Sequence, residues 1–137
     1  MSLQSILDGM PDVENLTEEV IISPRFVDEN GEAVKFRIRA MTQADFSRIK
    51  RANSVVDKKG VSTLNEANFH SQIVVEHCIE PSFKNSESIS RAGCATPVEL
   101  VNKKLTSGEI LALSNAISNL SGFGIDIDAL NEEIKNS

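Results

Sequence analysis

The strongest constraint on the fold is a change in hydrophobic period near residue 40. Over residues 34–39 every second residue is apolar and the residues between them are basic, which is the period of two expected for a β-strand. The dipeptide Asn30-Gly31 precedes this run and is the pair that most readily forms a type I′ hairpin turn. We therefore predict a β-hairpin over residues 19–39. Pro24 interrupts its first strand, which must be an edge strand or bend there.

After Thr42 the apolar residues recur at helical spacing, and capping signals divide the chain into helices. The expected helices begin at Thr42, Thr63, Thr96 and Ser107, and the first, second and fourth end at Gly60, Glu80-Pro81 and Gly122. The Ser-rich residues 82–95 predict a loop with one helical turn around Ile89, and Asp126 and Asp128 are placed to cap a final helix. These signals predict an α+β fold, predominantly α, with an N-terminal β-hairpin or small antiparallel sheet packed on a bundle of four or five helices.

No repeat or low-complexity linker divides the 137 residues, a length that fits one domain. We expect a single domain over residues 1–137, comprising a loosely ordered lead-in (1–17), the β-hairpin (19–39) and a helical part (43–136). Within the lead-in, the spacing of Leu3, Ile6 and Leu7 predicts one turn of a short helix.

Composition excludes several classes of function. The net charge of −6 and the absence of Trp and Tyr argue against nucleic-acid binding, which needs a basic surface and favours aromatic stacking. No apolar run approaches the roughly 20 residues of a membrane span, and no signal-peptide segment opens the sequence. Two cysteines do not make a disulfide framework at this length. We expect a soluble intracellular protein that binds other proteins, with no nucleic-acid or membrane partner.

The few residues able to support catalysis or metal binding are poorly arranged for it. His70 and His77 lie two helical turns apart, about 11 Å, which is too far for one metal ion. His77 is better explained as a half-buried packing residue and Cys78 as a small core residue. Cys94 beside Gly93 is expected to be structural, although a thiol or metal enzyme using Cys94 with His70 or His77 remains the competing hypothesis. We expect no enzyme activity, no cofactor and no metal.

Positive charge is concentrated in residues 25–59, which contain nine basic and five acidic residues, whereas the rest of the chain has five basic and 15 acidic ones. Eight basic residues can form one face across the hairpin and the first helix: Arg25, Lys35, Arg37, Arg39, Arg48, Arg51, Lys58 and Lys59. Such a face is either a solvated surface or a docking surface for an acidic segment of a partner protein.

The order of several short motifs resembles that of the XkdN-like phage tail assembly chaperones of Gram-positive siphophages and PBSX-like prophage elements. The resemblance covers about residues 18–136. The ordered series carries it, because each motif is common by itself: Ile22-Ser-Pro-Arg-Phe26, the Gly31 turn, Val34-Lys-Phe-Arg-Ile-Arg39, Met41-Thr-Gln43, Ile79-Glu-Pro81, Gly108-Glu109, Leu120-Ser-Gly-Phe123 and Asn131-Glu-Glu-Ile-Lys-Asn136.

The resemblance implies a non-enzymatic role in building phage tails. Such chaperones bind the tape measure protein, a long helical chain, and help to recruit tail-tube subunits around it. The implied location is the cytoplasm of the bacterial host, with no copies in the mature virion. The competing interpretation is a structural tail or head–tail connector component that is retained in the particle. Self-association is a further partner class that the sequence leaves open.

A chaperone for a helical client needs an apolar groove or strip with a polar surround. The C-terminal apolar residues exceed what one short terminal helix needs for docking, so they form an exposed patch or close the core. The candidate partner-binding residues are this apolar set and part of the basic face: Phe123, Ile125, Ile127, Leu130, Ile134, Arg37, Arg39, Arg48 and Arg51.

Overall fold

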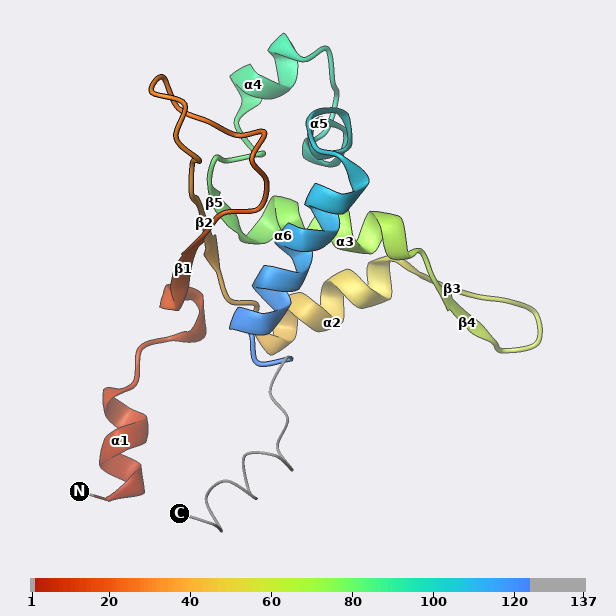
Figure 1. The fold of residues 1–137 in the computed structure, drawn as a ribbon. Coiled ribbons are helices and arrows are strands. Elements are labelled where there is room, and N and C mark those ends of the chain that lie inside the picture. The colour runs from red at the N-terminus through yellow and green to blue at the C-terminus, as the bar shows by residue number, and fades with distance from the viewer. Residues whose placement is uncertain (1, 124–137) are drawn as a thin grey trace, which may run out of the picture.

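The computed structural model describes residues 2–123 and places β2 (Phe36–Arg39) at the centre of a three-stranded antiparallel sheet (Figure 1). β1 (Thr17–Val20) pairs with one edge of β2, and β5 (Cys78–Glu80) pairs with the other. The alternation read from the sequence holds within β2, where Phe36 and Ile38 are 2% and 0% exposed. The β-hairpin and the α+β class are therefore confirmed.

The hairpin differs from the prediction in two details. Val34 lies outside the strand and is 37% exposed, and its backbone N–H donates to Phe26 O in the long connection before β2. A type I′ turn needs positive φ at both central residues. No non-glycine residue in the described part of the chain has positive φ. Of the pair Asn30 and Gly31, only Gly31, at φ 77°, therefore has the conformation that the turn requires. The predicted turn type is therefore wrong, and Asn30 keeps negative φ.

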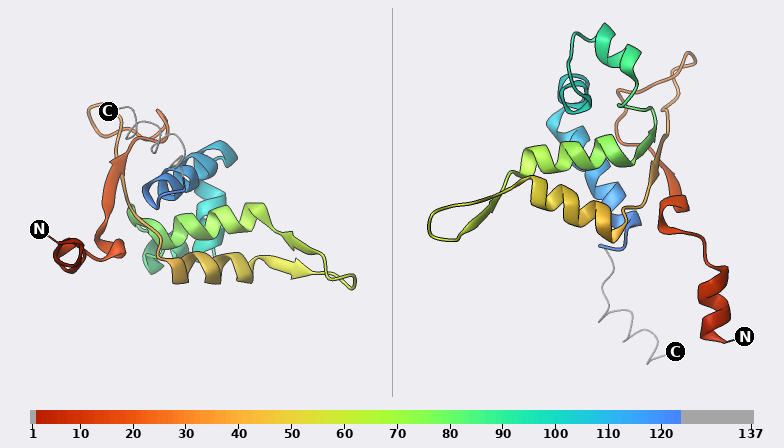
Figure 2. Two further views of the ribbon diagram at one scale, coloured as in Figure 1. Left: turned by 90° about the horizontal axis from the view of Figure 1, so that it is seen from below. Right: turned by 180° about the vertical axis from the view of Figure 1, so that it is seen from behind.

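The helical layer is organised around α3 (Glu66–His77) (Figure 2). It packs against α2 (Gln43–Ala52), α5 (Pro97–Lys104) and α6 (Ser107–Leu120). Each of the other helices starts at a side-chain cap, as in Thr42 Oγ1 accepting from Asp45 N and Thr96 Oγ1 accepting from Glu99 N. The short helix α4 spans Ser86–Arg91. The expected final helix lies outside the described residues.

Three predicted helix boundaries are wrong. The second predicted helix ends at His77 rather than at Glu80-Pro81, because residues 78–80 pair with β2 as β5. The other two are the end of the first helix and the start of the second. We expected the helix that begins after Thr42 to continue to Gly60, but α2 ends at Ala52. The chain then forms a second hairpin, β3 (Ser54–Val56) and β4 (Ser62–Leu64), before α3 begins at Glu66 rather than at the Thr63 capping box. We call residues 54–64 the arm, since Figures 1 and 2 show them projecting from the ends of α2 and α3.

The core lies between the sheet and the helices. The largest fully buried side chains come from β2, α2, α3, α5 and α6: Phe36, Ile38, Ile49, Ile73, Val74, His77, Val101, Leu113, Ser114 and Ile117. His77 is fully buried, whereas the sequence suggested half-burial, because α2 and the sheet both cover that end of α3. No helix in residues 2–123 is both long and apolar enough to span a lipid bilayer.

The N-terminal segment extends away from this core (Figure 1). α1 (Leu3–Gly9) and a 3₁₀ turn (Val13–Asn15) lead into β1, and neither contains a buried residue. The predicted short helix at Leu3, Ile6 and Leu7 is confirmed. All three apolar side chains are exposed, at 84%, 46% and 63%.

Candidate partner-binding surface

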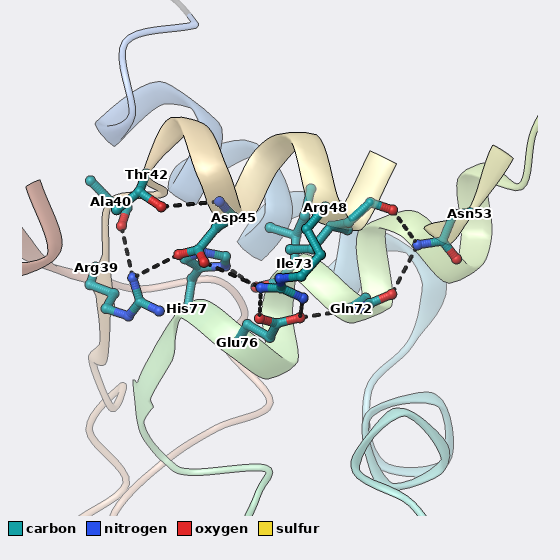
Figure 3. Close-up of polar contacts among 11 residues, drawn as sticks. Arg39, Ala40, Thr42, Asp45, Arg48, Asn53, Gln72, Ile73, Glu76 and His77 are labelled. Atoms are coloured by element: carbon teal, nitrogen blue, oxygen red, sulfur yellow. Dashed lines mark hydrogen bonds and ion pairs between the residues drawn. The ribbon is translucent and has the colours of Figure 1, made fainter. Parts of the chain in front are cut away.

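Two arginines of the predicted basic face take part in a polar network between β2, α2 and α3 (Figure 3). The Arg48 guanidinium donates to both carboxylate oxygens of Glu76 and, over 3.2 Å, to Asp45 Oδ1. Arg39 Nη1 lies 3.5 Å from Asp45 Oδ2. Both arginines are thus paired with carboxylates of the chain itself, which leaves little of their charge for a partner.

His77, at the end of α3, also belongs to this network and lies beside Asp45 (Figure 3). Its Nδ1 lies 2.8 Å from Ile73 O, and its Nε2 lies 3.5 Å from Asp45 Oδ2. Burial of the ring lowers the pKa of His77, with Arg39 acting in the same direction and Asp45 opposing it. For Asp45, burial would raise the pKa, but hydrogen bonds from Arg48 and Thr42 outweigh it and hold the pKa below its usual value. The arrangement joins three elements and keeps Asp45 ionised.

Burial also opposes ionisation of Glu76, yet the hydrogen bonds from Arg48 and Gln72 lower its pKa overall. The Glu76 carboxylate in turn raises the pKa of Arg48. These groups keep their charges over the physiological range and bind each other. Their geometry is that of a structural link between α2 and α3.

A third arginine fixes the connection before β2 to α6. The Arg25 guanidinium donates to both Glu109 oxygens, over 3.0 and 2.8 Å, and to Lys104 O. Glu109 is also the N3 residue of a capping box, accepting from Thr106 N over 2.8 Å. Glu109 therefore caps the start of α6 and also fixes residues 21–35 to this helix.

The remaining basic residues divide into two separate groups. Lys35 and Arg37 line a hollow of about 580 Å³ beside Arg25, Phe26 and Phe36. Arg51, Lys58 and Lys59 lie at the base and tip of the arm, on the other side of the helical layer (Figures 1 and 2). The expectation of one continuous basic face is therefore replaced by two basic groups, one on the sheet and one on the arm.

An apolar groove of about 480 Å³ runs between α3, α5 and α6. Its apolar lining is Ala67, Leu105, Ile110 and Leu111, and Leu111 is 46% exposed. The polar groups beneath it are satisfied within the chain. His70 Nδ1 lies 2.7 Å from Ser114 Oγ, and Ser71 Oγ donates to Asn102 Oδ1 over 2.6 Å. The groove thus offers apolar surface without an unpaired polar group in its floor.

Of the C-terminal apolar set, only Phe123 lies within the described residues. Its ring is 4.8 Å from that of Phe46, centroid to centroid, and the side chain is 58% exposed. Ile125, Ile127, Leu130 and Ile134 lie outside the described residues.

The cysteines and histidines are placed apart from any reactive arrangement. Burial raises the pKa of Cys78 to about 12, so the thiol stays protonated and unreactive at neutral pH. Cys94 Sγ contacts Ala92 O at 3.8 Å in the turn after α4. Within residues 2–123 no three His, Cys, Asp or Glu side chains gather in a way that would hold a metal ion.

Comparison with known proteins identifies the family of this chain. The family model described as "Phage XkdN-like tail assembly chaperone protein, TAC" matches residues 3–135. The chain belongs to this family. It is 32% identical to "Uncharacterized protein YqbN" and 29% identical to "Phage-like element PBSX protein XkdN", both of Bacillus subtilis (strain 168). Each alignment covers 86% of this chain and 83% of the relative.

A solved structure agrees with the assignment. The crystal structure of YqbN superimposes with a TM-score of 0.68 at 27% identity, covering 92% of this chain and 98% of the other. The resemblance read from the ordered motifs is therefore confirmed, as is membership in a family of tail assembly chaperones found in prophage elements. Sequence reasoning missed the groove, because residues of α3 come to lie beside those of α5 and α6 only in the folded chain.

Proposed function

We propose that this tail assembly chaperone binds the tape measure protein and helps to recruit tail-tube subunits during tail assembly, in the cytoplasm of the bacterial host and without catalysis. The observation that carries the proposal is the family match over residues 3–135. The fold supports it, because the chain offers an apolar groove and exposed basic residues such as Arg37 and Arg51 for a protein client.

The groove between α3, α5 and α6 is the surface on which we place a helical segment of the client. Such a segment presents apolar residues at three- and four-residue spacing, which Ile110 and Leu111 can receive. Phe123 and the apolar residues after it, Ile125, Ile127, Leu130 and Ile134, extend the proposed contact set. Among the basic candidates, Arg37 and Arg51 are better suited to contact a client than Arg39 and Arg48, whose carboxylate partners are intramolecular.

The direct test is co-expression with the tape measure protein of the same phage or prophage, followed by affinity capture of the complex. We expect the client to be soluble and captured only when the chaperone is present. Leu111→Asp in the groove and Leu130→Asp near the C-terminus should each reduce captured client by about tenfold or more. Ile79→Asp is the matched control, because Ile79 is similarly exposed, at 42%, but lies on β5 away from the groove.

The same experiments separate the proposal from its competitor. Mass spectrometry of purified tails should find no copies of this chain, whereas a structural tail or connector component would be retained. A client that is equally insoluble with and without the chaperone would refute tape measure binding. Equal capture by Leu111→Asp and Ile79→Asp would show that the groove is not the contact surface.

A further inference from the structure

Two exposed features lie at opposite ends of the described structure. One is the arm, residues 54–64, and the other is a segment that we call the acidic edge, residues 2–20, which ends in β1. All views in Figures 1 and 2 place α2, α3 and α6 between them. The arm of one chain therefore cannot reach the acidic edge of the same chain.

The arm is a sheet with two open edges. Within residues 2–123, β3 and β4 pair only with each other. Asn65 N donates to Asn53 O and Asp57 N to Val61 O, so the backbone groups of Ser54 and Val56, which alternate with these pairs, point outward. Its valines are also unusually exposed for a strand: Val55 68%, Val56 65% and Val61 56%.

The tip of the arm is positively charged. Lys58 and Lys59 occupy the turn, and the only carboxylate there, Asp57, accepts from the backbone N–H groups of Lys59 and Val61 over 2.8 and 2.9 Å. Arg51 adds a further exposed positive charge at the base. The arm therefore combines unpaired strand edges, apolar side chains and positive charge.

The acidic edge has the complementary properties. Ala40 N donates to Leu16 O, and Glu18 is paired with Ile38, so the backbone groups of Thr17 and Glu19 point away from β2. The segment contains five acidic residues and no basic one. Six apolar side chains along it are at least 45% exposed: Leu3, Ile6, Leu7, Met10, Val13 and Leu16.

We propose that the arm of one copy adds as a strand to the outer edge of β1 in a second copy of this chain. Strand addition satisfies the open backbone groups of both edges. It also brings the arm valines against apolar residues such as Leu16, and Lys58 and Lys59 against carboxylates such as Glu14 and Glu18.

The opposite placement of the two features determines the type of assembly. Each copy uses its arm for one neighbour and its acidic edge for another, so the contact is heterologous. Repetition of such a contact gives a closed ring or an open array. This inference stands on the described surfaces and does not depend on the identity of the client.

Sedimentation velocity of the full chain over a range of protein and salt concentrations tests the proposal. The wild-type chain should self-associate with rising concentration, and added salt should weaken the association because charge pairs contribute to it. The arm variant Lys58→Glu/Lys59→Glu and the edge variant Glu14→Lys/Glu18→Lys should each raise the apparent dissociation constant by about tenfold or more.

Mixing the two charge variants supplies a readout that a folding defect would not produce. In the mixture, the acidic arm of one variant meets the basic edge of the other, and the basic arm meets the acidic edge. Association should therefore return in the mixture although neither variant associates alone. Lys84→Glu/Arg91→Glu, which makes the same charge change on exposed residues around α4, should behave like the wild type.

A backbone variant separates strand addition from charge attraction. Val56→Pro removes an outward N–H without breaking a bond between β3 and β4, and should abolish association, whereas Val56→Thr keeps the N–H and should preserve it. A chain that stays monomeric at every concentration would overturn the proposal. So would charge variants that associate like the wild type, a mixture that fails to recover, or a Val56→Pro variant that behaves like Val56→Thr.

Discussion

The chain contains two β-turns with the same hydrogen bonds in very different surroundings. In the first, Asp28 Oδ1 accepts from Asn30 N and Glu32 N over 2.8 and 3.0 Å, and Gly31 N donates to Asp28 O. In the second, Asp57 makes the corresponding bonds to Lys59 N, Val61 N and Gly60 N. The two glycines have φ values of 77° and 81°. The local chemistry of both turns is the same.

The residues that flank the two turns differ in burial. The first turn leads into Phe36 and Ile38, which are buried in the core, and its connection is fixed to α6 by the Arg25–Glu109 ion pair. The second turn joins strands whose valines are more than half exposed. Turn chemistry thus specifies where the chain reverses, while burial of the flanking residues decides whether the hairpin supports the fold.

The largest expected contrast between the two hairpins is in global stability. Ile38→Ala should lower the free energy of unfolding by about 2–5 kcal/mol, because it leaves a cavity where the fully buried Ile38 side chain packs in the core. Val56→Ala should change it by less than about 0.5 kcal/mol, because Val56 is 65% exposed. Urea unfolding at low protein concentration, followed by circular dichroism, measures both. Similar losses for the two variants would mean that the arm is part of the cooperative core.

The two hairpins also show what the sequence could and could not predict. The caps at Thr42 and Thr96 were predictable because each bonds a backbone N–H three residues away. The end of α2 was not. Asn53 is held by Gln72 Oε1, 19 residues away on α3, and Val56 fits a helical period as well as a strand. Contacts distant in sequence decided this boundary.

The candidate partner-binding surface was also only partly predictable from the sequence. The concentration of basic residues was visible in the sequence, but the partner of Arg48 is Glu76, 28 residues away, and that of Arg25 is Glu109, 84 residues away. Composition cannot show which charges are matched within the fold. The groove likewise appears only when α3, α5 and α6 are placed together in the fold.

Substitution of Gly31 and Gly60 tests the same contrast between the two hairpins, with a smaller expected change in the free energy of unfolding. Both have φ near +80°, and the space that an added Cβ methyl group would occupy is open, so the cost of Gly→Ala is conformational, about 1–2 kcal/mol. For Gly31→Ala we expect that loss in global unfolding. For Gly60→Ala we expect faster amide hydrogen exchange within the arm and an unchanged global free energy.

Asparagine is the control at both positions, since it tolerates the left-handed region better than alanine and should recover part of each loss. A global loss for Gly60→Ala as large as that for Gly31→Ala would contradict the separation between an anchored hairpin and an independent arm.

The smallest predicted effect is a change in the pH dependence of stability. It tests the Arg25–Glu109 ion pair, which fixes the first hairpin to α6. Hydrogen bonds from Arg25, then Ser23 and the Thr106 backbone, hold the pKa of Glu109 well below its ordinary value near 4.3. Because the folded-state pKa is the lower one, the stabilisation is present above about pH 5 and is lost as the pH falls below the ordinary glutamate range. Glu109→Gln should therefore have a lower melting temperature at pH 7 and a shallower decline on acidification.

Glu99→Gln provides the matched comparison, because Glu99 is the N3 residue of α5 and accepts from Ala95 N, with no arginine ion pair among the described residues. Thermal unfolding from pH 7 to pH 3 should show the wild-type acid decline in Glu99→Gln and a weaker one in Glu109→Gln. If both variants follow the wild-type curve, the Arg25–Glu109 pair does not anchor the first hairpin. Burial of Phe36 and Ile38 would then account for the difference between the two hairpins by itself.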